Sequence, residues 1–289
     1  MGNRALKRRD GSRHGRSLKA ALLVAGVLSS GSLLAADATP AGQADYPGWR
    51  DAPLPDGPVG AAIDRGRLIL SNAPKYAAAY SGNALTCTNC HLDGGRTPAA
   101  APWVGIWGVF PEYRPRNAQI NTLSDRINDC FERSLNGKRM PHDAPEMTAI
   151  LTYMQWVSRE VPTGKSVPGR GFQRLEAPEP ASAERGAPLY AQHCASCHGH
   201  NGAGRGAIGD AAYVPPLWGP GSFNIGAGMA RLNNAAAFIK ANMPQGQAGT
   251  LDVQTAFDIA AYVTRQPRPD FARKAEDWPK GGKPPDARY

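Results

Sequence analysis

Two copies of one short motif constrain this chain more than any other feature. Residues 87–91 read Cys-Thr-Asn-Cys-His, and residues 194–198 read Cys-Ala-Ser-Cys-His. C-x-x-C-H is the attachment pattern of c-type haem: the two cysteines form thioethers with one porphyrin, and the adjoining histidine ligates its iron. A thioredoxin-like redox pair would not explain a histidine at the same offset twice, and a zinc site would need closely interleaved pairs, not pairs about a hundred residues apart. The motifs therefore predict two covalently bound haem c groups.

This assignment accounts for four of the five cysteines. Cys87 and Cys90 would hold the first haem, with His91 as proximal iron ligand. The second haem would be held by Cys194 and Cys197, with His198 as its proximal ligand. Cys130 is left over, and an odd cysteine in an exported protein needs an explanation.

The first 38 residues have the features of a cleaved signal peptide. Seven Lys and Arg precede an apolar run from Ala20 to Leu28, and Ala36-Asp37-Ala38 offers the small-x-small pattern of a cleavage site. The apolar run is too short to indicate a membrane span, although an uncleaved N-terminal anchor is the competing interpretation. We expect export to the periplasm.

The net charge argues against a nucleic-acid partner. The whole chain carries +9. Without residues 1–38, 26 basic and 22 acidic residues remain, so the net charge falls to +4. The mild positive charge that is left suits the attraction of an anionic substrate.

The sequence around each motif repeats. A Trp-Gly pair follows each one (Trp107-Gly108 and Trp218-Gly219), then a Met-Pro pair (Met140-Pro141 and Met243-Pro244), and then an apolar-periodic helix. We expect the closing helices at about 146–159 and 251–265, and a short helix around 186–190 before the second motif. This order resembles the cytochrome c domain family. It predicts a mainly α fold of two tandem cytochrome c-type domains, each wrapped around one haem.

Composition places the boundaries of these domains. We expect a signal peptide at 1–38, an extended leader at 39–60, a first domain at 61–162 and a second domain at 185–266. Residues 163–184 are rich in Pro and Gly and predict a linker, and residues 267–289 predict a tail or surface strap.

The distal iron ligands are harder to assign. In the second domain Met243 lies 45 residues beyond His198, a usual placement for a thioether ligand. Four other residues could ligate instead: Met229, Lys240, His193 and His200. In the first domain the repeat makes Met140 the counterpart of Met243, yet Cys130 lies nearer to the haem motif in the sequence. Spacing alone does not decide which of the two is the distal ligand.

Two longer segments carry a more specific resemblance. Residues 126–134 (Arg-Ile-Asn-Asp-Cys-Phe-Glu-Arg-Ser) and 215–229 (Pro-Pro-Leu-Trp-Gly-Pro-Gly-Ser-Phe-Asn-Ile-Gly-Ala-Gly-Met) resemble the signature segments of dihaem thiosulfate dehydrogenases. The resemblance runs from about residue 60 to residue 269. It implies a catalytic first haem ligated by His91 and Cys130, with Met140 in a structural role.

The resemblance also implies that the second haem relays electrons, with His198 and Met243 as its ligands. Some family members place lysine immediately before that methionine and exchange the two ligands with redox state. This chain departs from that pattern, because the position is Asn242.

The activity implied is the oxidation of two thiosulfates to tetrathionate, or the reverse reduction, with electrons passed to a soluble or membrane-bound cytochrome. Two dianions must approach each other, so cationic groups are needed. Arg116, Arg126 and Ser134 match the family's substrate-site residues. If residues 126–135 are helical, Arg126, Cys130 and Ser134 share one face. Each arginine has an alternative role as a haem-propionate partner or a solvated surface charge.

The resemblance and the lone cysteine also motivate a hypothesis in which Cys130 leaves iron and holds a thiosulfonate adduct between half-reactions. Three rival functions make different demands on the chain. A dihaem electron carrier would have no need of Cys130. Transfer of thiosulfate to a carrier-protein cysteine would need a docking surface that the sequence does not reveal, and a peroxidase would need an open iron. The reaction direction in the cell, the acceptor, the haem potentials and the oligomeric state are not determined by the sequence.

Overall fold

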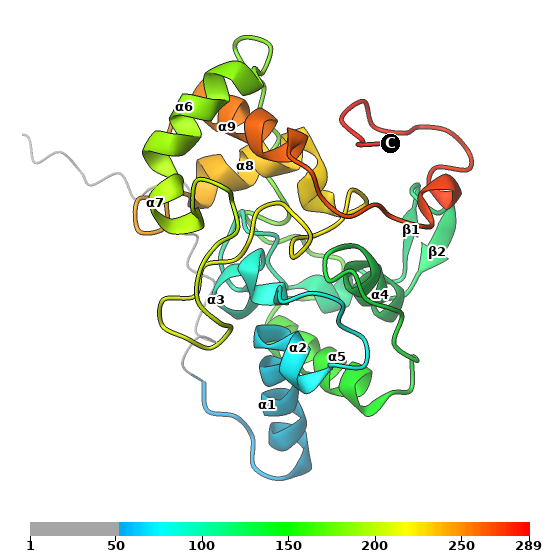
Figure 1. Ribbon diagram of the computed structural model, residues 1–289. Coiled ribbons are helices and arrows are strands. Elements are labelled where there is room, and N and C mark those ends of the chain that lie inside the picture. The colour runs from blue at the N-terminus through cyan, green and yellow to red at the C-terminus, as the bar shows by residue number, and fades with distance from the viewer. Residues whose placement is uncertain (1–51) are drawn as a thin grey trace, which may run out of the picture. The chain divides into compact units, whose positions relative to one another are not determined.

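A computed structural model describes residues 52–289 of the chain. The predicted signal peptide at 1–38 and most of the predicted leader at 39–60 lie outside this range. The described residues are mainly helical, with one two-stranded sheet (Figure 1). This agrees with the predicted fold class.

Two helices frame the first haem motif. α1 (Pro58–Ser71) packs against α5 (Pro145–Ser158), the predicted closing helix of the first half. A Cβ on Gly66 of α1 would lie 2.1 Å from the carbonyl oxygen of Ala149, so glycine permits this close crossing. Between these helices lie α2 (Ala73–Tyr76), η1 (Cys87–Asn89), α3 (Leu92–Gly95), η2 (Ile106–Gly108), the strands β1 (Glu112–Arg114) and β2 (Gln119–Asn121), and α4 (Leu123–Arg133).

The second half repeats the same crossing. α6 (Ala183–His193) leads into the second motif and packs against α9 (Val253–Arg265), again as predicted. A Cβ on Gly186 would lie 1.9 Å from the carbonyl oxygen of Asp258. The other elements of this half are α7 (Ala195–His198), η3 (Gly228–Ala230) and α8 (Leu232–Asn242), which packs against α9.

Local capping explains where the functional helix begins. α4 starts with a capping box, in which the backbone N–H of Asp125 donates to the Thr122 hydroxyl and the Asp125 carboxylate accepts from the backbone N–H of Thr122. Six residues of α4 are buried, including Ile127 and Phe131, so one face belongs to the first core. The register of α4 is therefore fixed at its start and along its length.

Residues 215–229 of the second half end against α4. The Asn224 backbone N–H donates to the carbonyl of Arg133 at 3.1 Å, and its Nδ2 donates to the carbonyl of Glu132 at 2.9 Å. These contacts satisfy carbonyl groups that a helix C-terminus leaves unpaired. Phe223 and Ala227 join the hydrophobic core of the first half. The second family-like segment thus completes the domain that carries Cys130.

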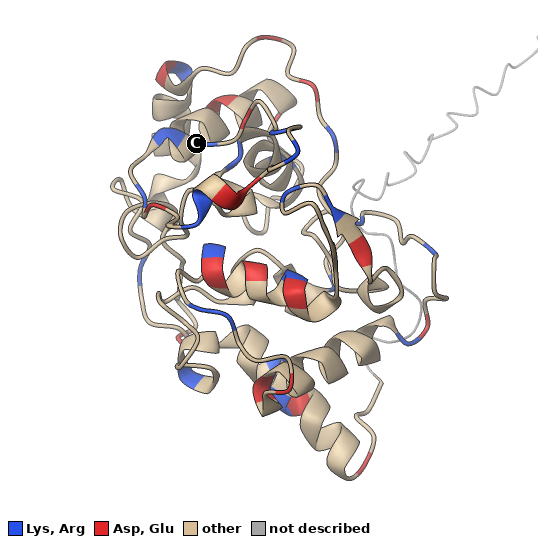
Figure 2. Cartoon of the chain, turned by 90° about the vertical axis from the view of Figure 1, so that its right-hand side faces the viewer, with Lys and Arg blue, Asp and Glu red and all other residues tan. Residues whose placement is uncertain are grey.

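The C-terminal residues also return to the first half, beside α4 and the β1–β2 hairpin (Figure 1). η4 (Lys274–Glu276) lies in this segment, and Phe271 and Trp278 are buried. Charged residues of both signs lie on α4 and on this segment (Figure 2). The predicted tail is thus a packed strap.

The observed helices differ slightly from the expected boundaries. α1 begins at Pro58, three residues before the expected start of the first domain, because Pro is favourable in the first turn of a helix. α6 begins at Ala183, and the Ser182 hydroxyl caps it by accepting from the backbone N–H of Arg185. Within residues 52–289, no helix combines the length and apolar character needed to cross a membrane.

Candidate functional site

The histidine of the first motif is oriented for metal ligation. Nδ1 of His91 lies 2.6 Å from the carbonyl oxygen of Ala101, which can only accept, so Nδ1 carries the proton and Nε2 is left as the ligating atom. The ring stacks on Trp103 at a centroid distance of 4.8 Å. Burial lowers the pKa of His91 to about 4; the hydrogen bond to Ala101 opposes this shift and the Arg126 charge adds to it. The imidazole is therefore neutral at neutral pH, as an iron ligand must be.

The second motif repeats this orientation. Nδ1 of His198 lies 3.1 Å from the carbonyl oxygen of Pro215, which again leaves Nε2 for ligation. Burial lowers the pKa of His198, and Arg205 lowers it further against the effect of this hydrogen bond. Pro215 begins the segment that ends at α4. One stretch of chain, residues 215–229, thus supplies both the Pro215 carbonyl that orients His198 and the Asn224 side chain that caps the C-terminus of α4.

Cys130 faces the first motif from α4. Burial and, to a smaller extent, the proximity of Cys130 raise the pKa of Cys90 to about 12; the same two causes raise the pKa of Cys87. All five cysteines of the chain are free thiols. The structure therefore brings Cys130 to the first attachment cysteines, where an iron ligand from α4 would have to lie.

Arg126 is the partner of the Cys130 sulfur. Its Nη1 donates to Sγ of Cys130 at 2.9 Å, one helical turn away. The negative charge of a Cys130 thiolate raises the pKa of Arg126, while burial opposes this. The Arg126 guanidinium therefore stays charged and places a positive charge beside the Cys130 sulfur.

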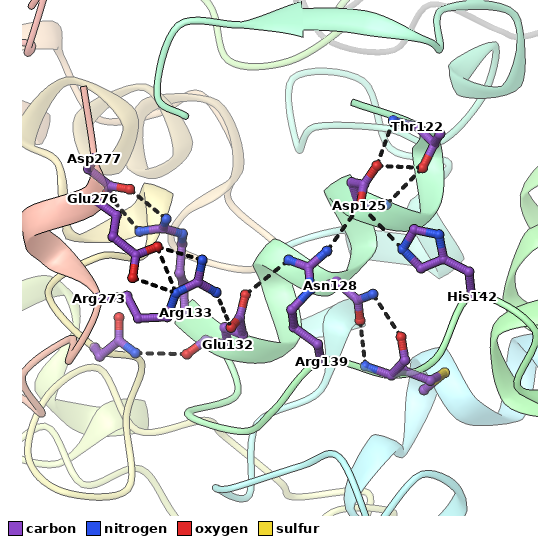
Figure 3. A network of polar contacts seen from close by, with 12 residues as sticks. Thr122, Asp125, Asn128, Glu132, Arg133, Arg139, His142, Arg273, Glu276 and Asp277 are labelled. Atoms are coloured by element: carbon purple, nitrogen blue, oxygen red, sulfur yellow. Dashed lines mark hydrogen bonds and ion pairs between the residues drawn. The ribbon is translucent and has the colours of Figure 1, made fainter. Parts of the chain in front are cut away.

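Met140, the rival ligand by repeat, is held in the protein core. Its side chain is 1% exposed, and its backbone N–H and carbonyl both hydrogen bond to the Asn128 side chain at 2.7 and 2.9 Å. Figure 3 shows this pair beside α4. These contacts fit the structural role that the resemblance implied for Met140.

Met243 follows α8 directly, and its backbone N–H donates to the carbonyl of Ile239. The preceding residue, Asn242, is buried and donates from Nδ2 to the carbonyls of Phe238 at 3.1 Å and Ala99 at 3.2 Å. His198 and Met243 are the residues that would hold the iron of the second haem. Asn242 ties the Met243 loop to the loop that orients His91.

Arg116 is held by three separate groups. It lies in the turn between β1 and β2, and its Nη1 donates to the carbonyl of Gly226 at 2.8 Å. Its Nε lies 3.5 Å from Asp277, and its guanidinium lies 4.9 Å from the ring centre of Trp278. The negative charge of Asp129 on α4 contributes to raising the pKa of both Arg116 and Arg126, although burial outweighs it at Arg116.

Ser134 caps the C-terminus of α4 rather than lying within the helix. Its backbone remains in a helical conformation, and its N–H donates to the carbonyl of Cys130 at 2.8 Å. The shared helical face that we expected for Arg126 and Cys130 is observed, and Ser134 lies at the end of the same helix.

A surface strap was predicted for the C-terminal residues, but its individual contacts were not. Asp277 accepts two hydrogen bonds from Arg133, at 2.7 and 2.8 Å, and also accepts from the Tyr289 hydroxyl. Arg273 bonds to Glu132 of α4 at 2.8 Å, which extends the network along the helix (Figure 3). Because these partners lie 141 to 144 residues apart in the sequence, no local sequence pattern predicts their contacts. The concentration of charges in the tail was the available signal.

The residues present fit haem c in both halves. Each motif supplies two free thiols and a neutral histidine whose Nε2 is available. In the first half the sulfur of Cys130 also lies near the attachment cysteines. Haem, when bound, would supply the one-electron redox chemistry.

Family comparisons match the two halves separately. Residues 74–163 match the family described as "SoxA/TsdA, cytochrome c domain". Residues 181–263 match the one described as "Cytochrome C oxidase, cbb3-type, subunit III". Both halves are therefore cytochrome c domains, which bind haem c.

Whole-chain comparisons find thiosulfate dehydrogenases. That of Psychrobacter arcticus is 44% identical over 239 residues, covering 82% of this chain and 73% of the relative. That of Allochromatium vinosum is 44% identical over 229 residues, covering 78% and 84%. The solved structure of thiosulfate dehydrogenase (TsdBA) from Marichromatium purpuratum matches with a TM-score of 0.73 and 39% identity. It covers 76% of this chain, which spans about half (49%) of that longer chain.

Proposed function

This chain belongs to the thiosulfate dehydrogenase family, and on that premise we propose that it couples two thiosulfate ions to tetrathionate in the periplasm. The reaction joins two sulfane sulfurs and releases two electrons, which two haem c groups pass to an acceptor cytochrome. The contact between Arg126 and Cys130 carries this proposal, because it places a fixed cation on a sulfur that faces the first haem motif.

The first requirement of the reaction is to bring two dianions together. At close range their repulsion is large in a partly buried site, where the dielectric screening is weaker than in water. Arg126 supplies a half-buried positive charge at Cys130, and Arg116 supplies a second one in the turn of the hairpin. A guanidinium can donate two parallel hydrogen bonds to oxygens of one sulfonate group. The two arginines would bind and orient thiosulfate, with the Ser134 hydroxyl as an additional donor.

Cys130 is proposed as the distal ligand of the first haem, and Met243 as that of the second. A thiolate lowers the iron potential and a thioether raises it. Electrons released at the first haem would therefore pass favourably to the second haem. Asn242 supports this arrangement, since its bond to Ala99 joins the loops of the two haem sites.

A periplasmic location follows from the sequence of residues 1–38 and from the attachment of haem c after export. The acceptor is proposed to be a cytochrome, because two haems in series deliver single electrons.

The test is thiosulfate oxidation by the purified holoprotein with ferricyanide as acceptor, with tetrathionate quantified as the product. The proposal predicts one tetrathionate for every two ferricyanide ions reduced. Cys130→Gly should abolish turnover while both haems are retained. Met140→Leu, a volume-conserving change in the core, is the matched control and should leave turnover intact.

A dihaem electron carrier gives a different pattern. It would be reduced and reoxidised by small redox agents but would form no tetrathionate, and Cys130→Gly would leave that cycling unchanged. This result would overturn the proposed function.

A further inference from the structure

Arg268 has buried donor groups that no described residue satisfies. It lies three residues beyond the end of α9, and its Nη2 donates to the carbonyl of Val263 at 2.9 Å. Its guanidinium lies 4.3 Å from the ring centre of Phe223. Nε and Nη1 are buried and have no hydrogen-bond partner within residues 52–289, and the same holds for Nη1 of Arg288.

These groups need an anion. A buried N–H without a partner is destabilising, and more so when the group is charged. Neither Arg268 nor Arg288 forms an ion pair with a carboxylate of the described residues. Burial, together with the nearby charge of Arg288, lowers the pKa of Arg268 to about 10. Arg268 therefore stays charged at neutral pH, without a counter-charge from residues 52–289.

The backbone on both sides of Arg268 is bonded to the segment that follows Pro215. The carbonyl of Pro267 accepts from Gly219 at 2.8 Å, and the carbonyl of Pro269 accepts from Ile225 at 3.0 Å. Arg268 is thus clamped alongside the segment that begins at Pro215, the acceptor for His198. That segment ends on α4, which carries Cys130.

We propose that Arg268, together with Arg288, binds a propionate carboxylate of one of the haem groups. Haem c carries two propionates, and a carboxylate accepts the paired N–H groups of a guanidinium edge. The orphan donors are buried and one arginine is stacked on a ring, so their partner must be permanent. If the anion were a substrate, its release after each turnover would leave the buried donors unpaired in every cycle. The inference rests on the haem content of the proposed function and not on thiosulfate oxidation.

The test compares Arg268→Gln with Arg265→Gln in the holoprotein. Arg265 lies three residues earlier, and its side chain is 66% exposed, so its loss removes the same charge from a solvated position. Spectroelectrochemical titration without thiosulfate gives the midpoint potential of each haem. Arg268→Gln should lower the potential of one haem, because the lost positive charge had destabilised the ferric state. Arg265→Gln should leave both potentials at the wild-type values.

Two further variants keep the test decisive if Arg268→Gln does not assemble. Arg268→Lys keeps the charge and should retain most of the wild-type potential. Arg288→Gln should lower the same haem potential. The haem that shifts identifies the propionate: a shift of the low-potential centre assigns it to the first haem, and a shift of the high-potential centre assigns it to the second.

The inference is overturned if no variant shifts either potential beyond the Arg265→Gln control. It is also overturned if Arg268→Gln raises the KM for thiosulfate with both potentials unchanged, since the anion would then be substrate. Failure of the proposed function would look different, because an inactive holoprotein can still show the predicted potential shift.

Discussion

Nη1 of Arg126 donates a hydrogen bond to Sγ of Cys130 at 2.9 Å, between residues one turn apart on α4. Contacts at both ends of α4 hold the helix that carries this pair. Thr122 and Asp125 set the start of α4, and Asn224 and the strap residue Asp277 hold its end. The helix that carries the proposed centre is thus stabilised by both cytochrome c domains and by the C-terminal segment.

Arg126→Gln should lower kcat/KM for thiosulfate by roughly 10- to 100-fold, because a charge-assisted hydrogen bond contributes about 1.5–3 kcal/mol. Steady-state kinetics with ferricyanide measures this. Arg126→Lys should recover only part of the loss, since lysine cannot form the bidentate contact. Arg139→Gln removes an arginine that pairs with Asp125 and Glu132 on the outside of α4 and should leave the kinetics unchanged. Equal effects of both substitutions would mean that Arg126 acts only through general charge.

Asp277→Asn should destabilise the holoprotein by roughly 3–5 kcal/mol, because it leaves the buried Arg133 charge without its counter-charge. The Asp277 side chain is 2% exposed and the Arg133 side chain 10% exposed. Urea unfolding followed by tryptophan fluorescence measures the change. Glu276→Gln in the same strap breaks an exposed pair with Arg273 and should leave the stability almost unchanged. A similar small loss for both variants would show that the strap does not stabilise α4.

Gly186→Ala should destabilise the second domain by at least about 1–3 kcal/mol, because the new methyl group overlaps a backbone carbonyl of α9. Thermal unfolding monitored at the haem absorbance measures this. Gly221→Ala is the matched control: its Cβ would meet nothing closer than 3.9 Å, so we expect a change within about 0.5 kcal/mol. Equal tolerance of the two substitutions would contradict the close crossing of α6 and α9.

Acid should weaken the second domain through Asp258. Burial raises the pKa of this carboxyl, but hydrogen bonds from Arg185, the Ser182 backbone and Gln254 outweigh burial and hold the pKa below its ordinary value. A lowered folded-state pKa gives stability that is present above the unfolded pKa of about 3.9 and is lost as pH falls through the folded value.

The measurement is the urea midpoint at pH 7 and at pH 3 for the wild type and Asp258→Asn. The wild type should be more stable at pH 7, and the difference should shrink at pH 3. Glu160→Gln, at a surface pair with Arg159, should follow the wild type at both pH values. A constant difference between wild type and Asp258→Asn would exclude linkage through this carboxyl.

The parts of the fold that depend on residues close together in the sequence could be predicted from it. The closing helix at 145–158 follows from its apolar period, and the contact of Arg126 with Cys130 follows from the i, i+4 spacing on a helix. The strap could not be predicted, because Asp277 meets Arg133 across 144 residues and no periodic pattern marks the tail. Asn224 was part of a recognised segment, yet its role as a cap for α4 depends on how two domains pack. Whether Cys130 and Met243 ligate iron stays a prediction.

The most direct test of the central claim is electron paramagnetic resonance of the oxidised holoprotein and of Cys130→Gly. The account predicts two low-spin ferric signals in the wild type, one of them with the narrow spread of a thiolate ligand. Cys130→Gly should lose that signal and keep the other unchanged, while Met140→Leu should keep both. Identical spectra for the wild type and Cys130→Gly, with a change in Met140→Leu, would contradict the account and make Met140 the ligand of the first haem.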